Sequence, residues 1–131
     1  MTPMGDPAKP KPAFTVQGRL RSFRFALAGI AVMLRTQHNA WLHLAATVVV
    51  VATAIVLKID AEDWRWLVVA FVLVWVSEAV NTAFEHLCDV VSPQFHTAVK
   101  TSKDIAAGAV LIAAVGAAAL GAMIFLPYLA R

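Results

Sequence analysis

The fold of this chain is decided by residues 66–89, WLVVAFVLVWVSEAVNTAFEHLCD, where an apolar run passes directly into a polar one. Every residue from Trp66 to Val76 is apolar, which is typical of a segment that enters a membrane. The residues that follow include two glutamates, an asparagine and an aspartate. Such side chains are costly at membrane depth, so they must either be neutralised or have a function.

The composition supports a membrane protein of one domain. The chain has 131 residues, of which 60% are hydrophobic and 15% charged. Soluble domains are about 45–50% apolar and about 25% charged. The single cysteine, Cys88, excludes an intramolecular disulfide and a thiolate cluster for zinc. We therefore expect an all-α membrane fold.

The N-terminal part divides into a tail and a helix. Residues 1–15 are rich in proline and small or polar residues, which predicts a disordered tail before an integral-membrane domain at 16–131. Residues 16–37 have apolar residues at helical spacing with arginines on other sides, which predicts an amphipathic helix on a membrane surface. Its alternative is a soluble helix packed on a core.

Three membrane spans are expected, at about residues 40–57, 64–90 and 103–127. Basic residues precede the first span and Lys100 and Lys103 precede the third, which predicts a cytoplasmic N-terminus and 91–104 loop. No zinc-finger or RNA-binding signature accompanies the basic residues, so nucleic acid is not expected as a partner. Small residues repeat every four positions in the third span, which favours close helix packing and makes a homo-oligomer plausible.

The polar residues of the second span share one helix face. At 100° per residue, Glu85 and Asp89 each lie about 20° from Glu78, and Asn81 lies about 60° from it. This row must face protein or a water-filled groove. It could be a structural stripe paired with the arginines, or a metal and acid–base site whose oxygens suit Mg²⁺. Lys103 could hold a phosphate beside it, and no P-loop is present.

The residues then resemble a known family. SEAVNTAFEHLCD is similar to the E-x-x-N-[ST]-[AS]-x-E-x-x-x-D signature of the small prokaryotic diacylglycerol kinase and undecaprenol kinase family. The blocks SPQFH and AVKTSKDIAAGAVLIA follow at close to that family's spacing, and the resemblance covers about residues 17–127. It implies a surface helix and three transmembrane helices in a homotrimeric bundle, with sites shared between subunits, in the bacterial inner (plasma) membrane.

The resemblance also implies the chemistry and the site. The family transfers the γ-phosphoryl group of Mg·ATP to a lipid hydroxyl at the cytoplasmic face, giving phosphatidic acid or undecaprenyl phosphate. Carried over, Glu78 matches the general base and Asn81 an amide that orients groups around it. Glu85 matches a magnesium ligand near the ATP phosphates. Further ATP-side positions are matched by Asp89, Phe95, His96, Lys103 and Asp104.

Three points stay open within this resemblance. Gln37 stands where many members carry a glutamate that also binds magnesium, so it is either a weaker metal ligand or a loop amide. Arg19 or Arg21 corresponds to a basic residue near the substrate. The stretch HNAWLH, residues 38–43, is more similar to the undecaprenol kinase branch, but the apolar surface does not separate the two lipids.

Two functions from other classes remain as alternatives. Aligned intramembrane carboxylates also occur in small proton- or ion-coupled transporters, which require polar groups through the full membrane depth. In this chain the outward half of the second span and the third span are apolar, which favours an enzyme that works at the interface. A structural membrane adaptor is the other alternative.

Overall fold

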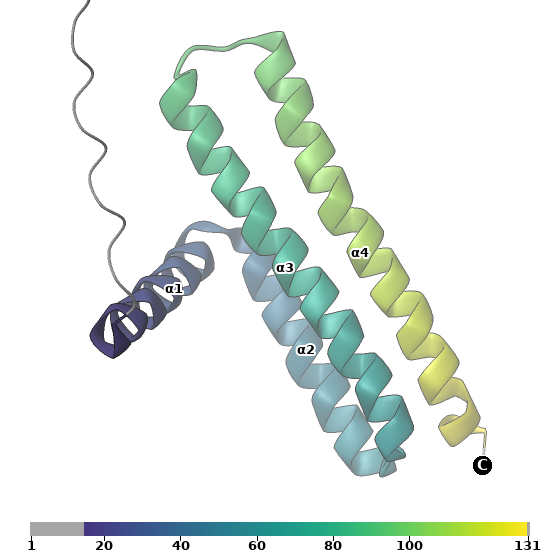
Figure 1. Ribbon diagram of the computed structural model, residues 1–131. Coiled ribbons are helices and arrows are strands. Elements are labelled where there is room, and N and C mark those ends of the chain that lie inside the picture. The colour runs from purple at the N-terminus through teal and green to yellow at the C-terminus, as the bar shows by residue number, and fades with distance from the viewer. Residues whose placement is uncertain (1–14, 131) are drawn as a thin grey trace, which may run out of the picture.

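Four helices form the part of the chain that the structure describes, residues 15–130 of a computed structural model (Figure 1). They are α1 (Val16–Thr36), α2 (His38–Leu57), α3 (Ala61–Val91) and α4 (Thr97–Leu129). The last three are long and apolar enough to cross a membrane. The expected all-α fold with three long apolar helices is confirmed. The tail predicted for residues 1–15 lies outside the described residues except for Thr15.

Local sequence signals explain where the helices begin and end. The Thr15 hydroxyl accepts a hydrogen bond from the Gly18 backbone N–H at 3.1 Å and so caps the start of α1. At the end of α2, Lys58 is left-handed (φ 50°), and the Ile59 N–H bonds back to the Ala54 carbonyl at 3.2 Å. This closure satisfies a terminal carbonyl and buries Ile59, so that α3 can return alongside α2.

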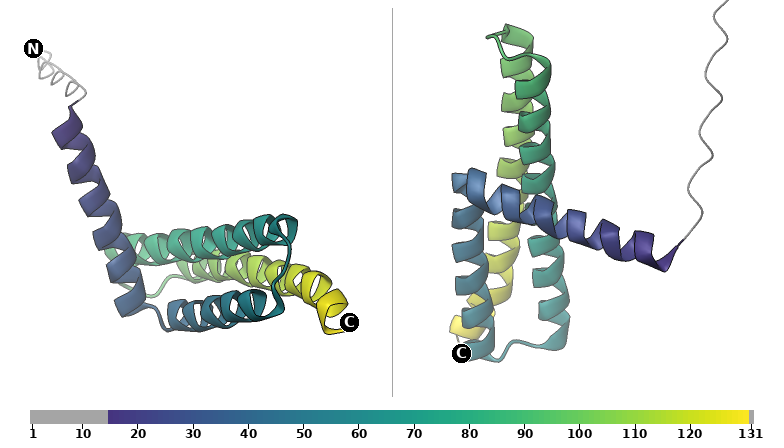
Figure 2. Two further views of the ribbon diagram at one scale, coloured as in Figure 1. Left: turned by 90° about the horizontal axis from the view of Figure 1, so that it is seen from below. Right: turned by 90° about the vertical axis from the view of Figure 1, so that its left-hand side faces the viewer.

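The helices are arranged as a bundle crossed by α1. In Figure 1, α3 and α4 run side by side for most of their length, and α2 lies along the half of α3 nearer its N-terminus. Figure 2 shows α1 running across the direction of the other three helices. The loop end of the α3–α4 hairpin extends beyond the level at which α1 joins the bundle (Figures 1 and 2).

Two apolar contacts hold this arrangement together. At the end of the bundle away from that loop, a core of residues from α2, α3 and α4 and the loop after α2 is centred on Ala54, Ile59, Leu67 and Ile124. Near the other end, Met33 of α1 is buried at 4% exposure, and α1 meets α3 beside Ala79 and Ala83. This second contact brings the α1–α2 corner to the polar segment of α3.

Candidate active site

The centre of the site is a buried polar segment of α3. Glu78 is 1% exposed, Asn81 4% and Thr82 5%, and these three are the buried polar or charged residues within the described range. The Thr82 hydroxyl donates to the backbone carbonyl of Glu78 at 2.9 Å, not to its carboxylate. The predicted polar face of the helix is therefore turned into protein at this point.

The Glu78 carboxylate is buried without a hydrogen-bond donor. Within residues 15–130, both carboxylate oxygens of Glu78 lack a hydrogen-bond partner, and so does the Oδ1 of Asn81. Buried polar groups are satisfied in most proteins, and leaving one unpaired costs roughly 1–3 kcal/mol, more for a charged group. A free energy cost of this kind is tolerated where the group has a function.

Glu85 lies two turns after Glu78 along α3 and receives two amide donors. The Gln37 Nε2, from the α1–α2 corner, donates to Glu85 Oε2 at 2.9 Å. The Asn81 Nδ2 donates to Glu85 Oε1 at 3.4 Å. The structure thus brings Gln37, Asn81 and Glu85 together, and Gln37 presents its amide nitrogen to the carboxylate. Whether Gln37 also binds a metal stays a prediction.

A histidine of α2 faces Glu78 from across the site. The His43 Nε2 lies 3.9 Å from Glu78 Oε2. The next turn of α2 is attached to α3, because the Trp75 Nε1 donates to the Thr47 hydroxyl at 3.2 Å. That hydroxyl in turn donates to the His43 carbonyl at 2.7 Å. This chain of hydrogen bonds holds His43 opposite Glu78.

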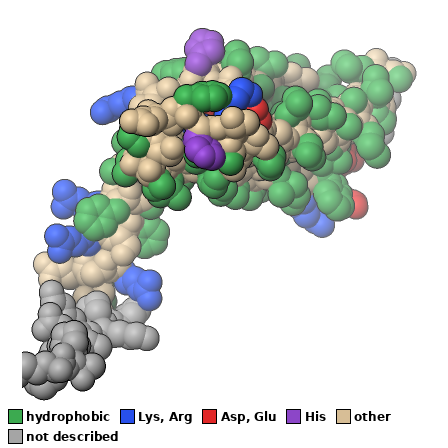
Figure 3. All heavy atoms as spheres, turned by 90° about the horizontal axis from the view of Figure 1, so that it is seen from above, with side chains coloured by type: hydrophobic (Ala, Val, Ile, Leu, Met, Phe, Trp, Pro, Cys, Tyr) green, Lys and Arg blue, Asp and Glu red, His purple; other side chains and the backbone are tan. Residues whose placement is uncertain are grey.

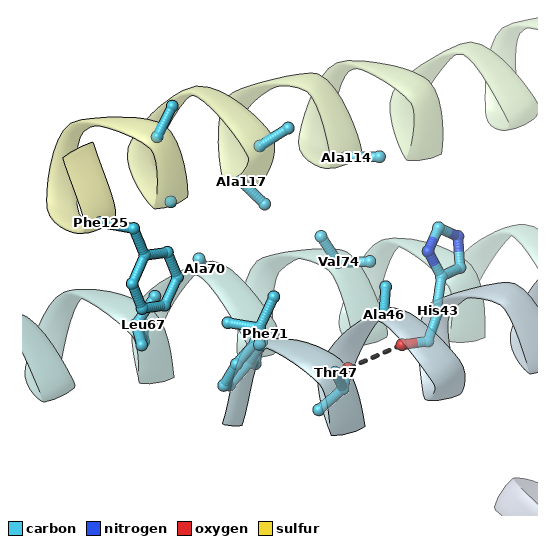
Figure 4. Close-up of a pocket in the computed structure, with 14 residues that line it drawn as sticks. His43, Ala46, Thr47, Leu67, Ala70, Phe71, Val74, Ala114, Ala117 and Phe125 are labelled. Atoms are coloured by element: carbon cyan, nitrogen blue, oxygen red, sulfur yellow. Dashed lines mark hydrogen bonds between the residues drawn. The ribbon is translucent and has the colours of Figure 1, made fainter. Parts of the chain in front are cut away.

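Two cavities meet at His43. One of about 220 Å³ contains the polar groups and is lined by Asn39, Leu42, His43, Glu78, Asn81, Glu85, Ala107, Val110, Leu111 and Ala114. The second, of about 370 Å³, is almost wholly apolar and shares His43 and Ala114 with the first. Figure 4 shows the His43 ring at one end of this apolar cavity, directed toward α4, and Phe125 at the other end. The site thus joins a carboxylate to a hydrocarbon-lined space.

The charged residues at the loop end of the hairpin form two separate ion pairs. Lys103 of α4 donates to Asp89 of α3 at 2.6 Å. Lys100 donates to Asp104, one turn away on α4, also at 2.6 Å. The structure therefore brings Asp89 and Lys103 together, whereas Asp104 pairs within its own helix. Figure 3 shows acidic and basic side chains in contact among hydrophobic ones in a view onto this end.

The remaining predicted residues lie apart from Glu78 in the single chain. Phe95 is 82% exposed in the α3–α4 loop. The His96 Nδ1 accepts from the Ala98 N–H at 3.2 Å and caps α4. Arg19 and Arg21 are exposed on α1, and the Arg21 guanidinium lies 5.8 Å from the Phe25 ring centre. Sequence spacing did not predict this separation.

The side chains of the site suit a magnesium ion that is bound partly by phosphate and water, and do not suit a metal bound by protein ligands alone. No three His, Cys, Asp or Glu side chains in residues 15–130 lie close enough to hold an ion by themselves. Mg²⁺ usually takes one or two carboxylates and completes its shell with water and phosphate oxygens. The Glu85 carboxylate and the unpartnered Oδ1 of Asn81 are hard donors of that kind. These residues are compatible with a magnesium ion that arrives with a phosphate.

Comparison with known proteins decides the family. The family model described as prokaryotic diacylglycerol kinase matches residues 24–125. The chain belongs to the prokaryotic diacylglycerol kinase family. The resemblance drawn from the SEAVNTAFEHLCD motif is therefore confirmed, and the matched range of this family member contains Gln37, His43 and the whole polar segment of α3.

Two relatives of this family member differ in name. The diacylglycerol kinase of Synechocystis sp. is 38% identical over 109 residues, which are 82% of this chain and 62% of that protein. The undecaprenol kinase of Bacillus subtilis is 34% identical over 109 residues, 83% of this chain and 89% of the relative. This chain thus spans less than two thirds of the Synechocystis protein but most of the Bacillus one.

The sequence analysis missed His43 and Asn39 as residues of the site. His43 is the single titratable residue between Ala40 and Leu57. A titratable side chain in an otherwise apolar span was the signal that could have identified it. Its partner, Glu78, lies on another helix, so the pairing required the structure.

Proposed function

We propose that this protein is a Mg²⁺-dependent lipid kinase that transfers the γ-phosphoryl group of ATP to the hydroxyl of a membrane lipid. The observation that carries this proposal is the Glu78 carboxylate, which is buried at 1% exposure and has no donor among the described residues. A carboxylate can only accept hydrogen bonds, so an incoming hydroxyl would supply the missing donor. The adjoining apolar cavity would suit the hydrocarbon part of such a molecule.

Glu78 acts as the general base in this reaction. The lipid hydroxyl oxygen forms a bond to the γ-phosphorus while the bond from that phosphorus to the β,γ-bridging oxygen breaks. ADP leaves with the electron pair, and the hydroxyl proton passes to a Glu78 carboxylate oxygen. Asn81, one turn away, orients the groups around Glu78 and fixes Glu85 through its Nδ2. Phosphoryl transfer depends mainly on such positioning and on charge stabilisation.

The nucleotide side of the site lies toward the loop end of the hairpin. Glu85, with Gln37 beside it, would hold Mg²⁺, which when bound neutralises charge on the phosphate oxygens. Lys103 is placed to contact phosphate, since its ammonium is already held toward α3 by Asp89. Asp104, Phe95 and His96 complete the proposed ATP side. Their distance from Glu78 supports sites that are shared between the subunits of a homotrimer.

The arrangement of α1 supports a cytoplasmic site. Arg19, Arg21 and Arg24 are exposed on a helix that runs across the bundle (Figure 2), and basic and hydrophobic side chains alternate along it in Figure 3. Such a helix lies in the plane of a membrane interface. Its basic residues favour the cytoplasmic face of the bacterial inner membrane. One of Arg19 and Arg21 would contact the substrate there.

The distribution of buried polar groups argues against an ion-coupled transporter. Within residues 15–130, the buried polar side chains are Glu78, Asn81 and Thr82, all within about one turn of α3. A transport path needs polar groups across the whole membrane. The apolar lining that continues from His43 to Phe125 does not offer one.

The lipid acceptor is either diacylglycerol or undecaprenol, and the HNAWLH stretch favours undecaprenol. The test uses purified protein in mixed micelles with labelled ATP and Mg²⁺, with each lipid in a parallel reaction. We expect labelled phosphatidic acid or undecaprenyl phosphate from the wild type and none from Glu78→Gln. If the folded wild type phosphorylates neither lipid, the proposed function is wrong.

A further inference from the structure

One titratable residue of the site has no part in the scheme above. His43 lines both cavities, and its side chain is 17% exposed. Its Nε2 lies 3.9 Å from Glu78 Oε2, and this is the ion-pair contact of that carboxylate within residues 15–130. The question is what this imidazole does for Glu78.

The surroundings of Glu78 leave few routes for a proton. On α3, Glu85 is the neighbouring charged group, and its oxygens already accept from Gln37 and Asn81. The α4 side of the cavity is apolar, lined by Ala107, Val110, Leu111 and Ala114. On α2, His43 is the one ionisable residue that lines this cavity. A proton taken up by Glu78 would therefore meet a single basic group nearby.

The position of His43 is held by the fold. The Thr47 hydroxyl bonds both to the His43 carbonyl and to the Trp75 indole, and Trp75 precedes Glu78 by less than one turn of α3. This link connects the backbone of His43 to the helix that carries Glu78. The distance between the imidazole and the carboxylate therefore depends on the packing of α2 against α3, which this hydrogen-bonded link fixes at the level of the site.

We propose that His43 is a positioning residue that takes the proton from Glu78 and so restores the carboxylate after each transfer. This inference rests on the proposed function. Once the lipid proton is on Glu78 Oε2, the two side chains close from 3.9 Å to hydrogen-bond distance and the proton moves to the Nε2 of neutral His43, leaving a carboxylate beside an imidazolium. The imidazolium then loses the proton to water on its exposed side. The attraction between the two charges offsets part of the cost of forming them at a buried carboxylate and a half-buried imidazole.

The test compares His43→Gln with the wild type in the lipid kinase assay. Glutamine keeps a polar side chain but cannot accept a proton. We expect kcat to fall about a hundredfold, the lower end of the effect of losing an acid–base group, with the KM for ATP unchanged. The pH profile of kcat should differ between the variant and the wild type, because the variant lacks the proton acceptor beside Glu78.

A second variant keeps the inference testable if glutamine disturbs folding. In His43→Ala, added imidazole should restore part of kcat, and His86→Gln is the control. His86 is an exposed histidine of α3 that faces the α1 side, so its variant should keep the wild-type pH profile. A His43→Gln enzyme with wild-type kcat and pH profile, or His43→Ala without imidazole rescue, would overturn the inference. An inactive wild type would instead overturn the proposed function.

Discussion

The amide nitrogen of Gln37 donates a hydrogen bond of 2.9 Å to the carboxylate of Glu85, although 48 positions separate the two residues in the chain. This contact attaches the α1–α2 corner to the polar segment of α3. It also explains how an amide can occupy a position beside a proposed magnesium ligand: it neutralises no charge, but it orients the carboxylate.

Replacing Gln37 with glutamate should exchange a hydrogen bond for a second metal-binding carboxylate. Without Mg²⁺, two carboxylates in contact repel each other, so the variant should melt at a lower temperature than the wild type. With Mg²⁺ it should need several-fold less metal for half-maximal activity, because carboxylates are better ligands than amides. Thermal melts and activity titrations over Mg²⁺ concentration measure both effects. Gln37→Ala is the control, and an unchanged magnesium requirement in Gln37→Glu would contradict a ligand role for this position.

Replacing Glu78 with glutamine should abolish most of the activity without destabilising the fold. Removal of the base should lower kcat by at least about a hundredfold. The folded state should be as stable as the wild type or more stable, because an unpaired buried carboxylate is replaced by a neutral group. Kinase assays and thermal melts in the same detergent test this pair of effects. Glu62→Gln, at an exposed acid in the first turn of α3, should change neither property. Wild-type turnover in Glu78→Gln would show that another group is the base.

Replacing Lys103 with alanine should weaken ATP binding. Its ammonium is held between α3 and α4 by Asp89, whereas Lys100 pairs along α4 itself. We expect the KM for ATP to rise about tenfold in Lys103→Ala, in line with the loss of a charge-assisted hydrogen bond to phosphate. Lys100→Ala is the matched control and should alter KM much less. Equal effects of the two substitutions would mean that general positive charge, not the position of Lys103, attracts the nucleotide.

Replacing Thr47 with valine should loosen α2 from α3. The change removes the acceptor of the Trp75 indole and should lower the free energy of unfolding by about 1 kcal/mol. Thr53→Val is the control, because the Thr53 hydroxyl donates to the Val49 carbonyl of its own helix. Thermal or denaturant unfolding in detergent distinguishes the two. A Thr47→Val protein as stable as Thr53→Val would show that this link between the helices contributes nothing measurable.

Helical periodicity was sufficient to predict part of this site. Glu78, Asn81 and Glu85 follow one another on a single helix, so the angle per residue places them on a common face without tertiary information. Gln37 was singled out only through the family resemblance. That its amide donates to Glu85 depends on the angle at which α1 leaves the bundle, which no local pattern encodes.

Other features required the packing of whole helices. His43 faces Glu78 because α2 is rotated to bring Thr47 onto Trp75, and that rotation is a tertiary property. Asp89 shares the helical face of Glu78 but remains exposed, with 68% of its side chain accessible, since α3 and α4 extend there beyond the other helices. Helical periodicity predicts which face of α3 carries Asp89, but it does not predict whether α1 or α2 extends far enough to bury that face.

The Thr82 hydroxyl has a consequence for selectivity. Its proton goes to a backbone carbonyl, and Asn81 and Gln37 each donate one amide hydrogen to Glu85. The bonds made by these three side-chain donors thus go to other acceptors, while the Glu78 carboxylate has no donor in the part of the chain that the structure describes. A ligand with a hydroxyl group can donate a hydrogen bond to Glu78. An ester, ether or ketone of similar shape has no such donor and would place another lone pair next to the carboxylate. The pocket would therefore select an alcohol over its ester or ether, because the neighbouring donors bond elsewhere and leave Glu78 as an acceptor.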